Sequence, residues 1–166
     1  MLDTITRHIS ALANQPGTLS LLTVFKAIGD RLSCQPLATA GLVIKAGTST
    51  LAKIGATAYH GTVQGKLVTI AAATDMPALT GLVITASSYN VACFFIDTAS
   101  TVTMLYGTEA TTRAAVKFPE FPEGKTLVGF LIITHSATFT GGTTALDTAT
   151  TQYVSPVGAF DPKILL

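Results

Sequence analysis

The stretch YNVACFFID, Tyr89–Asp97, decides the fold class of this chain. It is apolar at consecutive positions and is rich in aromatic and β-branched side chains. A run of this kind predicts a central strand that is covered on both faces. A second run of the same character, TLVGFLIIT at Thr126–Thr134, is the other candidate for a fully buried strand.

The segments between these two runs carry the pattern of half-buried strands. In TVTMLYG, Thr101–Gly107, the side chains of Val102, Met104 and Tyr106 face one way and the threonines face the other. RAAVKF, Arg113–Phe118, alternates in the same manner. Alternation with a period of two predicts a strand with one face in the core, so we expect a strand in each segment.

Turn signals recur along the rest of the chain. Gln64–Gly65 separates two β-prone runs and predicts a tight hairpin, and Tyr153–Val154 is expected to be a last short strand. Turn signals about every ten residues, with no helices between the strands, indicate about eight strands in an antiparallel sandwich or barrel. We expect a mainly β protein with a jelly-roll-like β-sandwich, formed by residues 37–166.

The first 36 residues have a different, helical pattern. Ile5, Ile9 and Leu12 recur at helical spacing, and the segment 18–36 predicts a second helix that ends at Pro36. The apolar stripe of this second helix consists of Leu22, Phe25, Ile28 and Leu32, widened by Leu21. We therefore expect a two-helix N-terminal arm, residues 1–36, whose stripe packs on the protein's own sheet or on a neighbour.

The segment KFPEFPEGK, Lys117–Lys125, repeats Phe-Pro-Glu twice. Proline fixes φ and donates no backbone hydrogen bond, so a ladder cannot continue through it. Polyproline II has about three residues per turn, which places Phe118 and Phe121 along one edge and Glu120 and Glu123 along another. This proline rod is either a braced corner between two strands or a docking ridge for a neighbouring subunit.

The composition narrows the class of function. Hydrophobic residues make up 48% of the chain and charged residues only 11%, whereas about 25% is usual for globular proteins. A chain with so little charge is expected to hide surface against copies of itself or a larger partner. The formal net charge of +1, without a basic cluster, argues against nucleic-acid binding, and no apolar run is long enough to span a membrane.

The sequence has no motif that indicates catalysis, a cofactor or a metal. The acidic residues Asp75, Asp97, Glu109, Asp147 and Asp161 each fall beside turn residues, where we expect structural roles. The spacing of His8, His60 and His135 does not match a metal site. A small hydrolase would require His60 or His135 to meet an aspartate in a pocket. We expect Cys34 and Cys93 to be reduced structural cysteines, with a disulfide as the alternative.

The C-terminal segment DPKILL ends in Ile164, Leu165 and Leu166. These side chains either complete the protein's own sandwich or dock into an adjacent subunit, since exposed apolar termini promote association. The candidate interaction anchors of the chain are Leu22, Phe25, Ile28, Leu32, Phe118, Phe121, Ile164, Leu165 and Leu166.

Four segments carry a resemblance to a known family: TAGLVIKAG (Thr39–Gly47), FPEFPEGKTLVGFLII (Phe118–Ile133), GGTTALD (Gly141–Asp147) and SPVGAFDPKILL (Ser155–Leu166). Together they resemble small virion structural proteins of tailed bacteriophages, of the head decoration or cement type. The resemblance implies a β-sandwich that binds the outside of an icosahedral capsid and clamps neighbouring subunits. The family is not defined by a site, so it assigns no functional residue.

From the resemblance and the composition we expect a non-enzymatic protein without cofactors. Its expected partners are the major capsid protein and copies of itself, and its expected location is the capsid surface of the virion, with the host cytoplasm during assembly. The alternative is a tail- or fibre-associated structural or receptor-binding protein. The scarcity of Tyr and the absence of Trp count against sugar stacking by such a protein.

Overall fold

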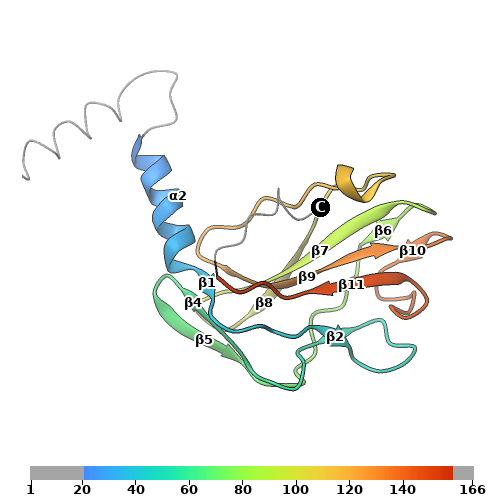
Figure 1. Cartoon of the computed structure of the whole chain (residues 1–166), viewed down its shortest axis with the longest axis horizontal. Helices are drawn as coiled ribbons and strands as arrows, with labels where there is room; N and C mark the ends of the chain where they lie inside the picture. The colour runs from blue at the N-terminus through green and yellow to red at the C-terminus, as the bar shows by residue number, and fades with distance from the viewer. Residues whose placement is uncertain (1–20, 159–166) are drawn as a thin grey trace, which may run out of the picture.

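The structure of the protein is a computed structural model, of which residues 21–158 are described. Over this range it is a mainly β protein with antiparallel sheets and one α-helix (Figure 1). In chain order the elements are α2 Leu21–Ser33, β1 Gln35–Pro36, β2 Val43–Ile44, β3 Ala52–Lys53, β4 Tyr59–Val63, β5 Lys66–Ile70, β6 Val83–Ile84, β7 Tyr89–Ile96, β8 Val102–Tyr106, the 3₁₀ helix η1 Arg113–Ala115, β9 Thr126–Thr134, β10 Phe139–Thr140 and β11 Thr150–Val154.

The largest sheet has the strand order β11-β9-β7-β8, with every pair antiparallel. β7 and β9 are its two inner strands, and their residues from Asn90 to Ile96 and from Thr126 to Ile133 are buried. The prediction of two fully covered strands is therefore confirmed. The strands expected around Thr101–Gly107 and Tyr153–Val154 are also present, as the edge strands β8 and β11.

A β-bulge interrupts the pairing of the two inner strands. Phe94 pairs with Gly129 whereas Phe95 pairs with Leu127, so Val128 is the extra residue on β9. A Cβ on Gly129 would lie 2.7 Å from the carbonyl oxygen of Val154. Glycine is therefore required where the bulge brings the neighbouring backbone close.

Each face of this sheet is covered by a different part of the chain. The larger core lies between one face and the short sheets formed by β1–β6 and β10, and it includes Phe94, Leu131, Tyr59 and Phe139. This arrangement of two packed layers is consistent with a β-sandwich. On the opposite face, the connection from β8 to β9 covers a second, smaller core around Phe95 and its neighbours. Two-sided cover explains why β7 and β9 are apolar at successive positions.

The short sheets have the orders β1-β4-β5, β2-β3 and β10-β6. Gln64 and Gly65 join β4 to β5 with φ angles of 52° and 77°. Positive φ at both central residues is what a type I′ hairpin turn requires, so the predicted tight hairpin is confirmed. β1 pairs with β4 although it lies within the expected arm, and the paired sheet therefore begins at Gln35.

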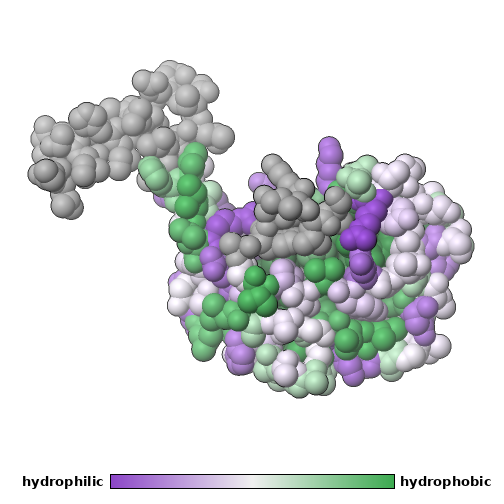
Figure 2. Space-filling view, in the orientation of Figure 1, coloured by the Kyte–Doolittle hydropathy of each residue, from purple (hydrophilic) through white to green (hydrophobic). Residues whose placement is uncertain are grey.

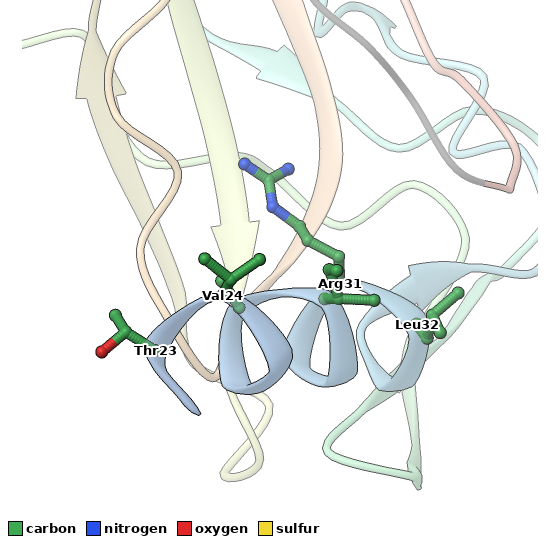
Figure 3. A pocket seen from close by; sticks show the side chains of 6 residues that line it. Thr23, Val24, Arg31 and Leu32 are labelled. Atoms are coloured by element: carbon green, nitrogen blue, oxygen red, sulfur yellow. The ribbon is translucent and has the colours of Figure 1, made fainter. Parts of the chain in front are cut away.

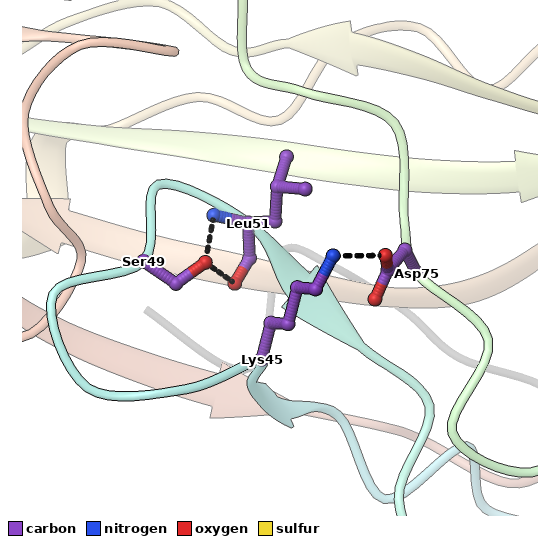
Figure 4. Close-up of polar contacts among 4 residues, drawn as sticks. All are labelled: Lys45, Ser49, Leu51 and Asp75. Carbon is purple, nitrogen blue, oxygen red and sulfur yellow. Dashed lines mark hydrogen bonds and ion pairs between the residues drawn. The ribbon is translucent and has the colours of Figure 1, made fainter.

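One polar contact on the surface links the β2–β3 hairpin to the rest of the domain, and another lies within its loop. The ammonium of Lys45 lies 2.5 Å from a carboxylate oxygen of Asp75, and the Ser49 hydroxyl bridges to the backbone of Leu51 (Figure 4). The Lys45–Asp75 pair is solvent-exposed, and such pairs contribute about 0–1 kcal/mol. This hairpin therefore depends more on its buried Ala52 than on the ion pair.

The strand predicted at Arg113–Phe118 is wrong. Residues Arg113–Ala115 form η1 and are exposed, and Lys117 makes only an isolated bridge to Thr108. The inner strands already have neighbours on both sides, so this segment crosses the face of the sheet and buries Val116 there. Its two alanines also add little packing to a pleated surface. The described residues hold eleven strands rather than about eight, because five of them are only two residues long.

Candidate functional site

Helix α2 projects from the β domain instead of lying on it (Figure 1). The apolar side chains of Val24, Phe25, Ile28 and Leu32 are exposed by 41%, 54%, 49% and 67%. We call these four residues the outer face of α2. Helical spacing places them in one stripe. The sequence predicted Phe25, Ile28 and Leu32 as members of it but not Val24, and the stripe does not pack on the protein's own sheet. Leu22 lies within α2, and the helix expected around Ile5–Leu12 lies outside the described residues.

The opposite side of the helix is the side that is attached to the body. Asp30 lies about 160° around the helix from both Ile28 and Leu32. Its two carboxylate oxygens accept the backbone N–H of Gly124 at 3.1 and 3.2 Å, and the Cys34 thiol donates to one of them at 3.5 Å. An acidic side chain near a helix C-terminus opposes the macrodipole, and these hydrogen bonds offset that cost. The helix is thus attached through a polar residue and turns its apolar stripe away.

The hairpin turn between β4 and β5 makes the second attachment. The N–H of Gly65 donates to the carbonyl of Ser33 at 3.1 Å, and the N–H of Gln64 donates to the Cys34 sulfur at 3.2 Å. Burial, the largest influence, raises the pKa of the Cys34 thiol, and the nearby Asp30 carboxylate acts in the same direction. The thiol therefore stays protonated at neutral pH and can donate to Asp30.

The proline rod contacts the C-terminal part of α2. The Phe121 ring packs edge-on against Phe95 with centroids 5.1 Å apart, and Phe118 packs edge-on against Phe130 at 4.9 Å. The Arg31 guanidinium lies over the Phe121 ring, 4.7 Å from its centroid. Cation–π contacts of this kind contribute about 0.5–1 kcal/mol at exposed sites. The rod therefore connects the sheet core to the arm.

The burial of the rod has the period of three that its sequence indicates. Phe118 and Phe121 are half-buried against the second core, and Glu120 and Glu123 are exposed. The two rings thus face the protein's own sheet and the acidic edge faces solvent. That Phe118 and Phe121 anchor a neighbouring subunit stays a prediction.

An apolar groove runs along one side of α2 (Figure 3). It has a volume of about 410 Å³, and the described residues that line it all belong to the helix: Thr23, Val24, Ala27, Ile28, Arg31 and Leu32. These residues form two rows with a spacing of four, which is the ridge pattern that helices use for packing against other segments. The groove ends at Arg31 and Leu32, next to the attachment of the helix to the body.

Further exposed apolar side chains lie near the base of α2. Leu37, just after β1, is 54% exposed, Leu67 on the edge strand β5 is 61% exposed, and Val157 is 56% exposed. Figure 2 shows hydrophobic colour along α2 and again below it, over the sheet formed by β1, β4 and β5. Exposed patches rimmed by polar residues mark interaction sites.

The acidic residues are engaged in turns and surface contacts. Asp97 accepts the N–H groups of Ala99 and Thr101, Asp147 accepts that of Thr48, and Glu109 accepts that of Thr85. The hydrogen bond from Thr85 lowers the pKa of Glu109. Asp97 thus has the structural turn role that its sequence context predicts. Asp161 lies outside the described residues.

The two described histidines, His60 and His135, make separate local contacts. His60 Nδ1 lies 3.0 Å from the Thr69 hydroxyl, and His135 Nδ1 contacts the backbone of its own turn at Ala137. Cys34 and Cys93 are free thiols, the latter buried. Within residues 21–158, histidine, cysteine and acidic side chains form no group of three or more that could hold a metal ion. His8 lies outside this range.

Over the same described range, no helix combines the length and the hydropathy needed to cross a bilayer. The anchors Ile164, Leu165 and Leu166 lie outside the described residues.

The sequence did not reveal Asp30 as the residue that attaches the helix to the β domain. One signal in the sequence could have indicated it: an acidic side chain near the C-terminus of a helix is unfavourable to the helix dipole, so it suggests a specific partner.

No family model, curated protein or solved structure matches the chain.

Proposed function

We propose that this chain is a non-enzymatic decoration or cement protein that binds the outside of a bacteriophage capsid and clamps neighbouring capsid subunits. The observation that carries the proposal is the outer face of α2, which is held away from the domain by polar contacts on the other side of the helix. A stripe presented in this way is suited to binding another protein. Low charge over the whole chain supports the same assignment.

The apolar side chains on the outer face supply the affinity. Fully burying a Val, Leu, Ile or Phe side chain contributes about 1.5–3 kcal/mol, and the four side chains begin about half exposed. Association and side-chain ordering consume much of that gain, so one arm binds weakly. Attachment of many copies across a lattice raises the effective affinity without new kinds of contact.

The attachment at Asp30, Arg31 and Phe121 gives α2 a fixed direction. A clamp between subunits needs a defined angle between its anchor and its body, because ordering a loose arm on binding costs free energy. The proline rod and the β4–β5 turn supply this angle. We further propose a jelly-roll-like sandwich, a two-helix arm over residues 1–36, and a homo-oligomer on the virion surface after assembly in the host cytoplasm.

A binding experiment tests the role of the outer face. Undecorated capsids of the partner capsid protein are mixed with the intact chain and with the variant Phe25→Ser/Ile28→Ser, and bound protein is measured by co-sedimentation. We expect the intact chain to bind and the variant to bind at least roughly tenfold more weakly, since each lost apolar contact of about 1.4 kcal/mol is a factor of ten. The matched control is Lys26→Ser, on the same exposed helix but off the stripe.

Equal binding by the intact chain and the double variant would refute the role of α2. No binding by the intact chain would refute the capsid assignment. A density map of the intact virion provides the independent test of location. Density for this domain on the shell supports the proposal, and density confined to the tail or fibres would replace it with the alternative class.

A further inference from the structure

We propose that two copies of this chain pair antiparallel through the free edges of their β5 strands, which joins the two β1-β4-β5 sheets into one continuous sheet. β5, Lys66–Ile70, is the last strand of its sheet and lies at the margin of the domain (Figure 1). The pairing does not depend on the capsid assignment. Only its consequence, a dimer that offers two outer faces to a capsid, rests on the proposed function.

The first argument is a row of unpaired backbone groups along β5. His60 pairs in register with Thr69, but its carbonyl accepts the N–H of Leu37 on the β1 side. This is therefore a non-hydrogen-bonded pair, and such pairs recur at every second residue of an antiparallel ladder. The N–H and C=O groups of Leu67 and Thr69 thus point away from β4. Within residues 21–158, no hydrogen bond engages these four groups.

The second argument is that this edge lacks protection against pairing. Proteins block exposed edges with prolines, bulges or charged side chains. The register of β5 with β4 is regular, and residues 67–70 include no proline and no charged residue. The ammonium of Lys66 is directed to the carbonyl of Thr98 in its own chain, at 2.8 Å. The side chain of Leu67 beside the free groups is 61% exposed.

The third argument is that β5 is complementary to itself. A two-fold axis at Val68 places Leu67 opposite Thr69 of the second copy, and Thr69 opposite Leu67 of the second copy. Each of these two pairs exchanges two N–H···O=C bonds, so all four free groups of each copy are used. The two Leu67 side chains become diagonal neighbours on the outward face, where long side chains reach one another. A second copy of the chain is therefore the partner that fits this edge.

The charges permit this arrangement. Lys66 is the one charged residue of β5, and in the proposed register it faces Ile70 of the second copy. The two lysines are then four residues apart along the strand direction, which is about 13 Å. This exceeds the Debye length of about 8 Å at physiological ionic strength, so their repulsion is screened. A single pair of strands is a small interface, and small interfaces are weak, so the dimer should dissociate on dilution.

The pairing determines where the two helices lie. In each copy the β4–β5 turn binds the C-terminal end of α2 through Gly65. Gly65 would face Ala71 of the second copy, so the two turns lie about 20 Å apart along the strand direction. One dimer then presents two outer faces, one at either end of the joined edges. On a capsid, such a dimer would contact two neighbouring subunits, and bivalent attachment raises the effective affinity.

Sedimentation equilibrium of the full-length protein tests the pairing, without capsids, from about 10 μM to 1 mM. Thr69→Pro removes an outward N–H and no bond to β4, and Leu67→Lys brings like charges together across the axis. We expect the wild type to dimerise and each variant to dimerise at least roughly tenfold more weakly. An equimolar mixture of Leu67→Lys and Leu67→Glu should dimerise more tightly than either variant alone. The matched controls are Val83→Lys and Val83→Glu on β6, at a similarly exposed strand position, and they should change nothing.

Three outcomes would overturn the proposal. The first is a monomer at every concentration, because the edge would then be unused or occupied by something other than a second copy. The second is a dimer that neither Thr69→Pro nor the Leu67 variants weaken. The third is a dimer that is lost in Phe25→Ser/Ile28→Ser but kept in the β5 variants, because the outer face of α2 would then be the interface.

Disulfide cross-linking provides a test that remains if Thr69→Pro fails to fold. The single variants Val68→Cys and Leu67→Cys are made in a Cys34→Ser background and equilibrated in a glutathione buffer. The two Val68 Cα atoms would lie about 4.5 Å apart across the axis, within disulfide range, whereas the two Leu67 positions are diagonal at about 7–8 Å. We expect more linked dimer from Val68→Cys, and equal or greater linkage through Leu67→Cys would overturn the register. Failure of capsid binding would leave these results unaffected, so the two proposals can fail separately.

Discussion

Replacing Phe121 by alanine should loosen the arm and destabilise the domain. The ring is half-buried and lies 5.1 Å from the ring centroid of Phe95 and 6.4 Å from that of Phe118. A fully buried Phe→Ala change costs about 3–5 kcal/mol, so half burial implies about 2 kcal/mol. Edge-on aromatic pairs contribute about 0.5–1.5 kcal/mol more. We expect the free energy of unfolding to fall by about 2.5–3.5 kcal/mol in total.

The measurement is urea unfolding followed by far-UV circular dichroism and tyrosine fluorescence, since the chain has no tryptophan. The matched control is Phe25→Ala, the same chemical change on the outer face, which should stay within about 0.5–1 kcal/mol of the wild type. A double-mutant cycle between Phe121→Ala and Arg31→Ala should give a coupling of about 0.5–1 kcal/mol from the cation–π contact.

Two results would refute this account of the arm. If Phe121→Ala costs no more than Phe25→Ala, the rod does not support the base of the helix. If the Arg31 and Phe121 changes are additive, their contact at 4.7 Å contributes no attachment energy. Hydrogen exchange of α2 in the same variants separates loosening of the arm from loss of global stability.

Three further predictions address other parts of the chain. Gly29→Ala should stabilise α2 by about 0.8–1 kcal/mol, because nothing lies within 4 Å of the added Cβ; a lower Tm by circular dichroism would contradict it. Gly129→Ala should cost about 1–3 kcal/mol or more, because its Cβ would meet the neighbouring backbone at 2.7 Å; an unchanged urea midpoint would show that the bulge can relax. Burial raises the pKa of the Tyr59 phenol above its ordinary 10.0, so the unfolded state loses this proton first. The free energy of unfolding should therefore carry the full Tyr59 contribution below pH 10 and lose up to about 1.4 kcal/mol per pH unit above it. Tyr59→Phe should flatten this decline in alkaline urea titrations, and an equally steep decline in the variant would assign it to other groups.

Much of the β domain follows from local pattern. The runs at Tyr89–Asp97 and Thr126–Thr134 are apolar at successive positions, and this requires cover on both faces wherever the strands lie. Gln64–Gly65 is a turn pair whose φ angles only a few residue types accept. The prediction of a strand at Arg113–Phe118 failed because a short alternating pattern does not show whether a neighbouring strand is free to pair. The inner strands β7 and β9 are already paired on both sides.

The candidate binding surface on α2 was likewise predictable from the sequence only in part. The stripe of Phe25, Ile28 and Leu32 is readable from helical spacing, since that spacing alone places side chains on one face. Which way the stripe points is not readable, because it depends on the hydrogen bonds between Asp30 and Gly124, 94 residues apart in the sequence. The same holds for the Phe-Pro-Glu rod, whose stiffness is local but whose place under Arg31 is not.

The sequence by itself determined the elements: two fully covered strands, a hairpin, an amphipathic helix and a stiff rod, because each arises from the chemistry of neighbouring residues. Only the tertiary structure decided that the helix is attached by its polar side and presents its apolar side outward. The physical reason is that orientation depends on contacts between distant segments, and residue order alone does not specify which donors and rings those segments bring to the base of the helix.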